Sequence, residues 1–291
     1  MQKESCFRRR KGLITIKKYF PLFVLPTLAA FAAFFIVPFV MGIYLSFNKF
    51  TTVSNAEWIG FGNYVKAFSN GDFLRALGFT SLFTAVSVIT VNLFAFLLAL
   101  ALTSAVRGKN IFRTIFFMPN LIGGIVLGYI WNLIINGVLA NFGVDISYSA
   151  KYGFWGLVVL TNWQLIGYMM VIYIAGLQNI PRDLHEAAEI DGATRFQTLK
   201  NVTVPMLMSS ITICTFLTLT NSFKLFDQNL ALTAGAPARK TAMLALDIYN
   251  TFYGRAGWQG VGQAKAVIFF LIVALIAFAQ LKITGSREVE S

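Results

Sequence analysis

The chain has 291 residues, of which 57% are hydrophobic and only 12% are charged, and its mean hydropathy is +0.68. Soluble domains carry about 25% charged residues, so this composition excludes an ordinary soluble enzyme and predicts an integral membrane protein. The formal net charge is +12. The basic residues of the chain form short tracts beside apolar runs. This arrangement is typical of the cytoplasmic loops of membrane proteins rather than of a nucleic-acid-binding face.

Six apolar windows are each long enough to cross a bilayer, which requires about 20 residues per helix. They cover roughly residues 20–46, 79–104, 112–135, 155–178, 205–227 and 264–283. The predicted fold is therefore an all-α integral membrane domain of six transmembrane helices over residues 20–283. It lies between a basic tail at 1–19 and a short tail at 284–291. The first apolar run is too long for a signal peptide, so we interpret it as an uncleaved span.

The distribution of positive charge predicts the orientation of these spans. Fifteen Lys and Arg residues flank one side of the predicted bundle and eight flank the other, with the densest tract at the N-terminus. Because positive charge is enriched on the cytoplasmic side, both termini and the loop at 179–204 are predicted to be cytoplasmic. The connections on the outer side are longer, yet none has room for a soluble catalytic domain.

Two spans are predicted to be broken by proline. Pro119 lies inside the third window, where it should kink the helix and free backbone carbonyls. In the first window, Pro21, Pro26 and Pro38 bracket the apolar core. Kinked membrane helices indicate packing around a path or a neighbour, and simple packing within the bundle is an equal alternative.

The most informative polar segment joins the fourth and fifth windows. Pro181 suits the first position of a short helix, and Asp191-Gly192 should end that helix because glycine accepts the left-handed conformation. Thr194 can cap a second helical turn, and Pro205 marks the entry to the next apolar run. The segment is thus predicted to be a compact helical elbow, a shape to which another protein can bind.

This segment resembles the cytoplasmic signature loop of the permease subunits of binding-protein-dependent ABC importers. The matching residues are Glu186, Ala187, Ala188, Asp191, Gly192, Ala193, Gln197, Leu199, Val202 and Pro205. Further similarity to the carbohydrate-uptake branch, which includes maltose, multiple-sugar and glycerol-3-phosphate permeases, covers essentially residues 20–283. It includes Phe226-Asp227 and the run from Leu232 to Pro237 in the outer loop after the fifth window.

The resemblance implies a subunit of the bacterial cytoplasmic (inner) membrane that works with several partners. These would be a second homologous permease, an ATP-binding subunit dimer and an extracellular or periplasmic solute-binding protein. The resemblance also implies a set of ATPase-coupling residues in the elbow: Glu186, Ala187, Ala188, Asp191, Gly192, Ala193 and Pro205.

The chain itself encodes no energy source. It has no G-x-x-x-x-G-K-[ST] loop to cradle ATP phosphates, and its single histidine, His185, falls in the elbow. No cofactor, metal or catalytic site is therefore expected, and ATP would be bound by a partner subunit. Lys224 and Asp227 are the only ionisable residues expected within a span. Their i, i+3 spacing allows a mutual pair, with snorkelling to the membrane interface as the favoured role.

Polar side chains in the fourth and fifth windows are candidates for the transport path. Gln164 and Tyr168 are spaced i, i+4, while Thr218, Asn221 and Ser222 form a stripe at i, i+3, i+4 that is costly in lipid. Amide, hydroxyl and aromatic groups suit a hydroxyl-rich cargo. The resemblance to maltose-type permeases implies that these positions contact sugar. Hydrogen bonding between spans is an equal alternative for any one of them.

The sequence therefore predicts a lipid-embedded permease subunit for ATP-driven import of a carbohydrate. One alternative is an ABC permease for glycerol-3-phosphate or another small solute. A second alternative, of a different class, is a stand-alone secondary carrier. Neither an enzymatic activity nor a nucleic-acid partner is expected.

Overall fold

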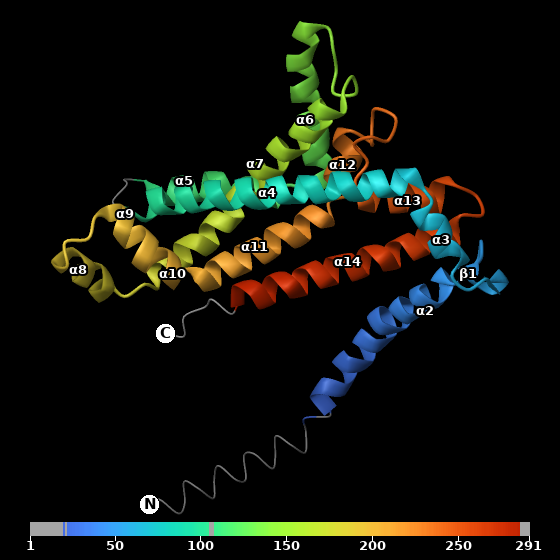
Figure 1. The fold of residues 1–291 in the computed structure, drawn as a ribbon, viewed down its shortest axis with the longest axis horizontal. Helices are drawn as coiled ribbons and strands as arrows, with labels where there is room; N and C mark the ends of the chain where they lie inside the picture. Colours follow the sequence, from blue (N-terminus) through green and yellow to red (C-terminus); the bar gives the residue numbers. More distant parts are fainter. Residues whose placement is uncertain (1–19, 21, 105–107, 286–291) are drawn as a thin grey trace, which may run out of the picture.

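The computed structural model describes residues 20, 22–104 and 108–285 (Figure 1). The expectations for the tail at 1–19, for Pro21 and for the last residues of the chain lie outside this described part. Within it, five helices are long and apolar enough to cross a membrane, and a bent pair of helices supplies a sixth. The predicted all-α fold of six spans is confirmed.

The first span, Leu22–Ser46, is one helix that ends with α2 (Val37–Ser46). A π-helical turn at Ala32–Ile36 precedes Pro38, with the N–H of Val37 donating to the carbonyl of Ala32. Because this wider turn adapts the helix to a residue that lacks an N–H, the expected break at the prolines does not occur. Among the helices, the span packs mainly against α14, and it leans away from the rest of the bundle (Figure 1).

Four long helices form the body of the bundle. They are α4 (Gly71–Thr103), α7 (Ala150–Gln178), α11 (Met208–Phe223) and α14 (Gln259–Gly285). The α4 helix packs against both α7 and α11, and α11 packs against α14. Buried apolar side chains fill the α4–α7–α11 contact, among them Val91, Met169 and Cys214. The hydroxyl of Tyr173 donates to Oδ1 of Asn92 at 2.9 Å, so polar contacts also join these helices.

The third predicted span is divided into two helices, as the proline predicted. It consists of α5 (Lys109–Phe117), a 3-10 turn at Met118–Leu121 and α6 (Gly124–Leu139). The α5 helix lies along α7, whereas α6 runs in a different direction (Figure 1). The contact with α7 is close, because a Cβ atom at Gly167 would lie 1.8 Å from the carbonyl oxygen of Phe116. Only glycine permits this approach.

The fifth span is also bent, and this break was not predicted from the sequence. The short helix α9 (Arg195–Thr198) leads through a π-helical turn at Leu199–Thr203 into α10 (Val204–Met206). The chain therefore passes through Pro205 in helical form and bends by 70° at Leu207, before α11 begins. The π turn lies just before Pro205, where the missing N–H removes the regular helical hydrogen bond.

The connection after α11 is folded rather than open. It contains α12 (Asp227–Leu232), which packs against α6, and α13 (Leu244–Gly254), which packs against α14. Buried Asn229 donates to the carbonyl of Thr241 at 2.8 Å, and the N–H of Met243 donates to the Asn229 side chain at 2.9 Å. The side-chain amide of Asn229 thus joins α12 to the residues just before α13.

The connection between the first span and α4 is similarly ordered by an amide. A short antiparallel pair, β1 (Asn48–Lys49) and β2 (Glu57–Trp58), precedes α3 (Gly62–Phe68). The buried side chain of Asn63 donates to the carbonyls of Ser46 and Asn48 at 2.9 and 2.8 Å. These contacts fix the end of the first span to α3.

A buried ion pair joins α13 to α14 at the same end of the bundle. The Lys265 side chain is completely buried in α14, and its Nζ donates to the Asp247 carboxylate at 2.7 Å and to the Thr251 hydroxyl at 2.8 Å. Lys265 also lies over the ring of Phe73. The expectation that Lys224 and Asp227 are the only ionisable residues within spans is therefore wrong. Lys265 lies close to the start of α14, and the count of positive charges had placed it in the outer loop before the sixth span.

Candidate functional site

The elbow, residues 179–204, lies at one end of the bundle, opposite the end that holds α3 and α13 (Figure 1). Its main helix is α8 (Arg182–Ile190), every residue of which is at least partly exposed. Pro181 has an extended backbone and is the N-cap rather than the predicted first helical residue. In either place the missing N–H leaves no helical hydrogen bond unmade.

The turn that ends α8 has the predicted geometry. Asp191 is the C-cap and Gly192 has a φ of +74°, with its N–H donating to the carbonyl of Glu189 at 3.1 Å. A Cβ at Gly192 would meet nothing within 4 Å, so the requirement for glycine is conformational. Thr194 caps α9 as predicted, because it exchanges hydrogen bonds with Gln197 in a capping box.

The elbow presents both charge and apolar surface. Ile190 is 86% exposed and Phe196 is 71% exposed, although both are large apolar residues in a polar segment. The charged side chain of Glu186, on α8, is exposed as well. Exposed apolar groups rimmed by polar residues mark interaction surfaces. The elbow therefore has the composition of a docking element.

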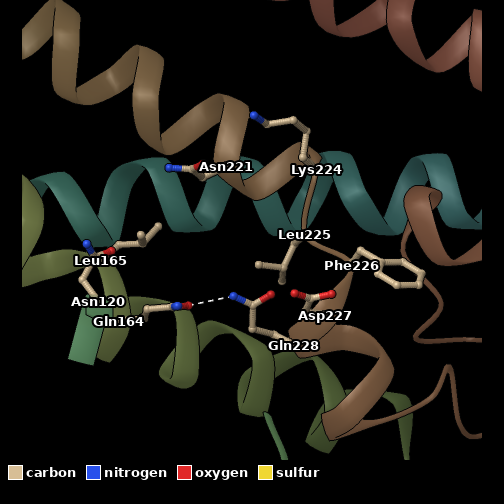
Figure 2. A pocket seen from close by; sticks show the side chains of 9 residues that line it. All are labelled: Asn120, Gln164, Leu165, Asn221, Lys224, Leu225, Phe226, Asp227 and Gln228. Atoms are coloured by element: carbon tan, nitrogen blue, oxygen red, sulfur yellow. Dashed lines mark hydrogen bonds between the residues drawn. The ribbon is translucent and has the colours of Figure 1, made fainter. Parts of the chain in front are cut away.

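A second candidate site is a cavity of about 350 Å³ where α7, α11 and α12 meet the turn before α6 (Figure 2). It is lined by Asn120, Gln164, Leu165, Asn221, Lys224, Leu225, Phe226, Asp227 and Gln228. Four of these side chains are amides and two are charged. Nε2 of Gln228 donates to Oε1 of Gln164 at 2.8 Å, which links α12 to α7 across the cavity. Asn120 and Asn221 bond no other described residue through their side chains.

Comparison with known proteins identifies the family. The model of the family described as binding-protein-dependent transport system inner membrane component matches residues 101–285. The chain is also 43% identical to the probable starch degradation products transport system permease protein AmyD of Thermoanaerobacterium thermosulfurigenes, over 92% of this chain and 94% of the relative. The chain belongs to this family. The permease is accordingly a multi-pass membrane protein, and the resemblance seen in its elbow is confirmed.

Other relatives agree over nearly the whole permease. The multiple sugar-binding transport system permease protein MsmF of Streptococcus mutans is 30% identical, with 92% of this chain and 95% of the relative covered. In fold, the permease matches a bacterial ABC transporter involved in import of the acidic polysaccharide alginate. That match has a TM-score of 0.78 at 21% identity, with 95% and 99% of the two chains covered.

The residues predicted for the transport path divide into two groups in the permease. Gln164 and Asn221 line the cavity together. Tyr168 lies one helical turn beyond Gln164 and packs against the Phe117 ring. Thr218 and Ser222 are fully buried within the bundle. Of the predicted stripe Thr218, Asn221 and Ser222, only Asn221 therefore faces the cavity.

Thr218 fits the alternative of hydrogen bonding within the bundle. Its Oγ1 donates to the carbonyl of Cys214 at 2.8 Å and accepts a longer hydrogen bond from Asn92 of α4 at 3.4 Å. The Ser222 hydroxyl is buried with no partner among the described residues. Neither residue lines the cavity of about 350 Å³.

Sequence reasoning missed several features of the permease's two sites. Asn120 and Gln228 enter the cavity from a turn and a loop helix that lie outside the windows used to search for path residues. The mutual pair that the i, i+3 spacing of Lys224 and Asp227 allowed, which was not the role favoured from the sequence, does not form among the described residues. Pro119 marked the break that places Asn120 at the cavity, and this was the one signal available in the sequence.

The predicted coupling residues are gathered at the elbow with one exception. Glu186, Ala187, Asp191 and Gly192 are exposed on α8 and its turn, and Ala188 and Ala193 are half-buried. Pro205 lies apart from them, within α10 and one turn before α11. Sequence reasoning did not single out Ile190 and Phe196, although two large apolar residues in a polar loop are themselves a signal for a contact surface.

Proposed function

We propose that this permease is a membrane subunit for ATP-driven import of a carbohydrate, and that it forms half of the translocation path beside a second permease. The main support is the cavity between α7, α11 and α12, whose amides suit the hydroxyl groups of a sugar. The printed names of the relatives refer to starch degradation products, multiple sugars and trehalose/maltose, which agrees with this cargo class.

The elbow is the proposed contact with an ATP-binding subunit dimer. Its exposed apolar residues and Glu186 would occupy a groove on the ATPase, and both termini and the 179–204 loop would be cytoplasmic. Within the elbow α9 leads from the turn after α8 into α10, which ends at the bend at Leu207, and α11 continues from there to Asn221 at the cavity. A rotation of the elbow would therefore act on the cavity through one helix, biasing a two-state alternating-access equilibrium.

Two other functions have less support. Bidentate binding of a phosphate group, such as that of glycerol-3-phosphate, is typical of arginine, whereas the described cavity is lined by no arginine, by one lysine and by a carboxylate that would repel phosphate. A stand-alone carrier would couple transport to an ion at a buried charged group. The buried ion pair of Lys265 and Asp247 makes its own hydrogen bonds and lines none of the described cavities, so it does not provide such a site.

Reconstitution into liposomes tests the proposed function. The permease would be combined with its second permease, its ATPase and its solute-binding protein, and uptake of radiolabelled malto-oligosaccharides measured with and without ATP inside the vesicles. We expect uptake only in the complete, ATP-loaded complex, together with ATP hydrolysis stimulated by the loaded binding protein. Uptake by the permease alone, or import of glycerol-3-phosphate but of no carbohydrate, would contradict the proposal.

A further inference from the structure

Two opposite charges line the cavity without neutralising each other. Lys224 is the C-cap of α11 and Asp227 is the first residue of α12, and both are exposed. Neither forms an ion pair with any residue in the described part of the chain. Figure 2 shows the Lys224 side chain extending away from Asp227. Both groups are therefore free to bind something that enters the cavity.

The end of α11 keeps the two charges apart. In a continuous helix, residues at i and i+3 lie on one face and can pair, but α11 stops at Phe223. The chain then turns through Leu225, which is buried, and Phe226 before α12 starts. This turn directs Lys224 and Asp227 to different parts of the cavity wall.

The backbone at Asp227 is held firmly in place. A Cβ added to Gly124 at the start of α6 would lie 2.7 Å from the Cβ of Asp227, so the two helices touch at this point. The next residue, Gln228, is hydrogen-bonded to Gln164 of α7. Asp227 is thus fixed by contacts of α12 with both α6 and α7, which suits a residue that must present its carboxylate at a defined position.

We propose that Lys224 and Asp227 are cargo-binding residues that select an uncharged oligosaccharide, an inference that rests on the proposed function. An ammonium group only donates hydrogen bonds and a carboxylate only accepts them, whereas a sugar hydroxyl does both. A neutral sugar can satisfy both groups, with the free amides of Asn120 and Asn221 beside them. An acidic sugar would bring its carboxylate close to Asp227, and a cationic sugar would meet Lys224.

Two isosteric variants in the complete reconstituted complex test this proposal. Asp227→Asn and Lys224→Met keep the size of each side chain and remove its charge. Loss of a charge-assisted hydrogen bond is expected to lower uptake of a neutral malto-oligosaccharide by about tenfold or more in each variant. Lys282→Met is the matched control, because this exposed lysine in the last turn of α14 lines none of the described cavities. Its uptake should equal that of the unmodified complex.

Competition by an acidic oligosaccharide tests the selection itself. The same binding protein serves every complex, so a difference between variant and unmodified complex reports the permease alone. A uronate-containing oligosaccharide should inhibit neutral uptake at a lower concentration in Asp227→Asn than in the unmodified complex. Equal inhibition of the two would overturn the selection against acidic cargo.

Direct labelling separates contact with cargo from a merely structural role. Amine modification of Lys224, followed by mass spectrometry, should slow at least severalfold when cargo is bound, whereas modification of Lys282 should not change. Unchanged labelling of Lys224, or full uptake by both variants, would overturn the inference while carbohydrate import by the unmodified complex still stood. Failure of the unmodified complex to import any carbohydrate would instead overturn the proposed function.

Discussion

Replacement of Gly192 by proline is expected to abolish transport while leaving the permease inserted in the membrane. Gly192 has a φ of +74° and donates its N–H to Glu189. Proline fixes φ near about −65° and has no N–H, so the turn between α8 and α9 cannot form. Because this turn sets the direction of the proposed coupling element, ATP-dependent uptake should fall to the level measured without ATP.

Gly143→Pro provides a matched control for this variant. Gly143 also has a left-handed backbone, with a φ of +69°, and donates its N–H to the carbonyl of Ala140 at 3.0 Å. It follows α6 and lies outside the elbow. Each variant disturbs one turn. Only Gly192→Pro should lose ATP-dependent uptake, because only its turn belongs to the proposed coupling element. Uptake at the unmodified rate in Gly192→Pro would show that the elbow does not couple ATP hydrolysis to uptake.

Replacement of Lys265 by methionine is expected to destabilise the permease strongly. It would leave the Asp247 carboxylate buried between α13 and α14 without its cation, since the two side chains are 0% and 3% exposed. Removal of one partner from a buried ion pair costs about 3–5 kcal/mol. The free energy of unfolding of the detergent-purified permease, measured by denaturant titration, should fall by that amount.

The double variant Lys265→Met/Asp247→Leu tests the cause of this loss. With both charges removed, no buried charge remains, and apolar replacements for a buried ion pair are often neutral or stabilising. The double variant should therefore recover most of the stability that the single variant loses. A double variant as unstable as Lys265→Met would show that packing at Lys265, rather than its charge, stabilises this end of the bundle.

Much of the fold follows from local sequence signals. Long apolar runs identified the spans, and Pro119 identified the break between α5 and α6. Gly192 and Thr194 identified the elbow's turn and cap, because each depends on the conformational preference of one residue type. Signals of this kind act over a few residues and can be interpreted without knowing what packs against them.

Features that depend on tertiary contacts could not be predicted in the same way. The cavity brings together Asn120, Gln164 and Asp227 from distant parts of the chain, and their meeting depends on how α6, α7 and α12 pack. Whether Lys224 can pair with Asp227 likewise depends on where the fifth span ends, which the apolar window placed at 227 and the structure places at Phe223. The bend at Leu207 was likewise not predicted, since Pro205 indicated only the entry to the fifth apolar run and lies within α10 just before the bend.

The contact between elbow and ATPase is tested most directly by site-specific crosslinking. Glu186→Cys would be introduced into a permease lacking its own cysteines, Cys6 and Cys214, and the assembled complex treated with a short bifunctional thiol reagent at each stage of ATP hydrolysis. We predict a crosslink from Cys at position 186 to the ATP-binding subunit whose yield changes with the bound nucleotide. Absence of that crosslink, or modification of the same cysteine by a membrane-impermeant reagent added outside intact cells, would contradict the proposed coupling.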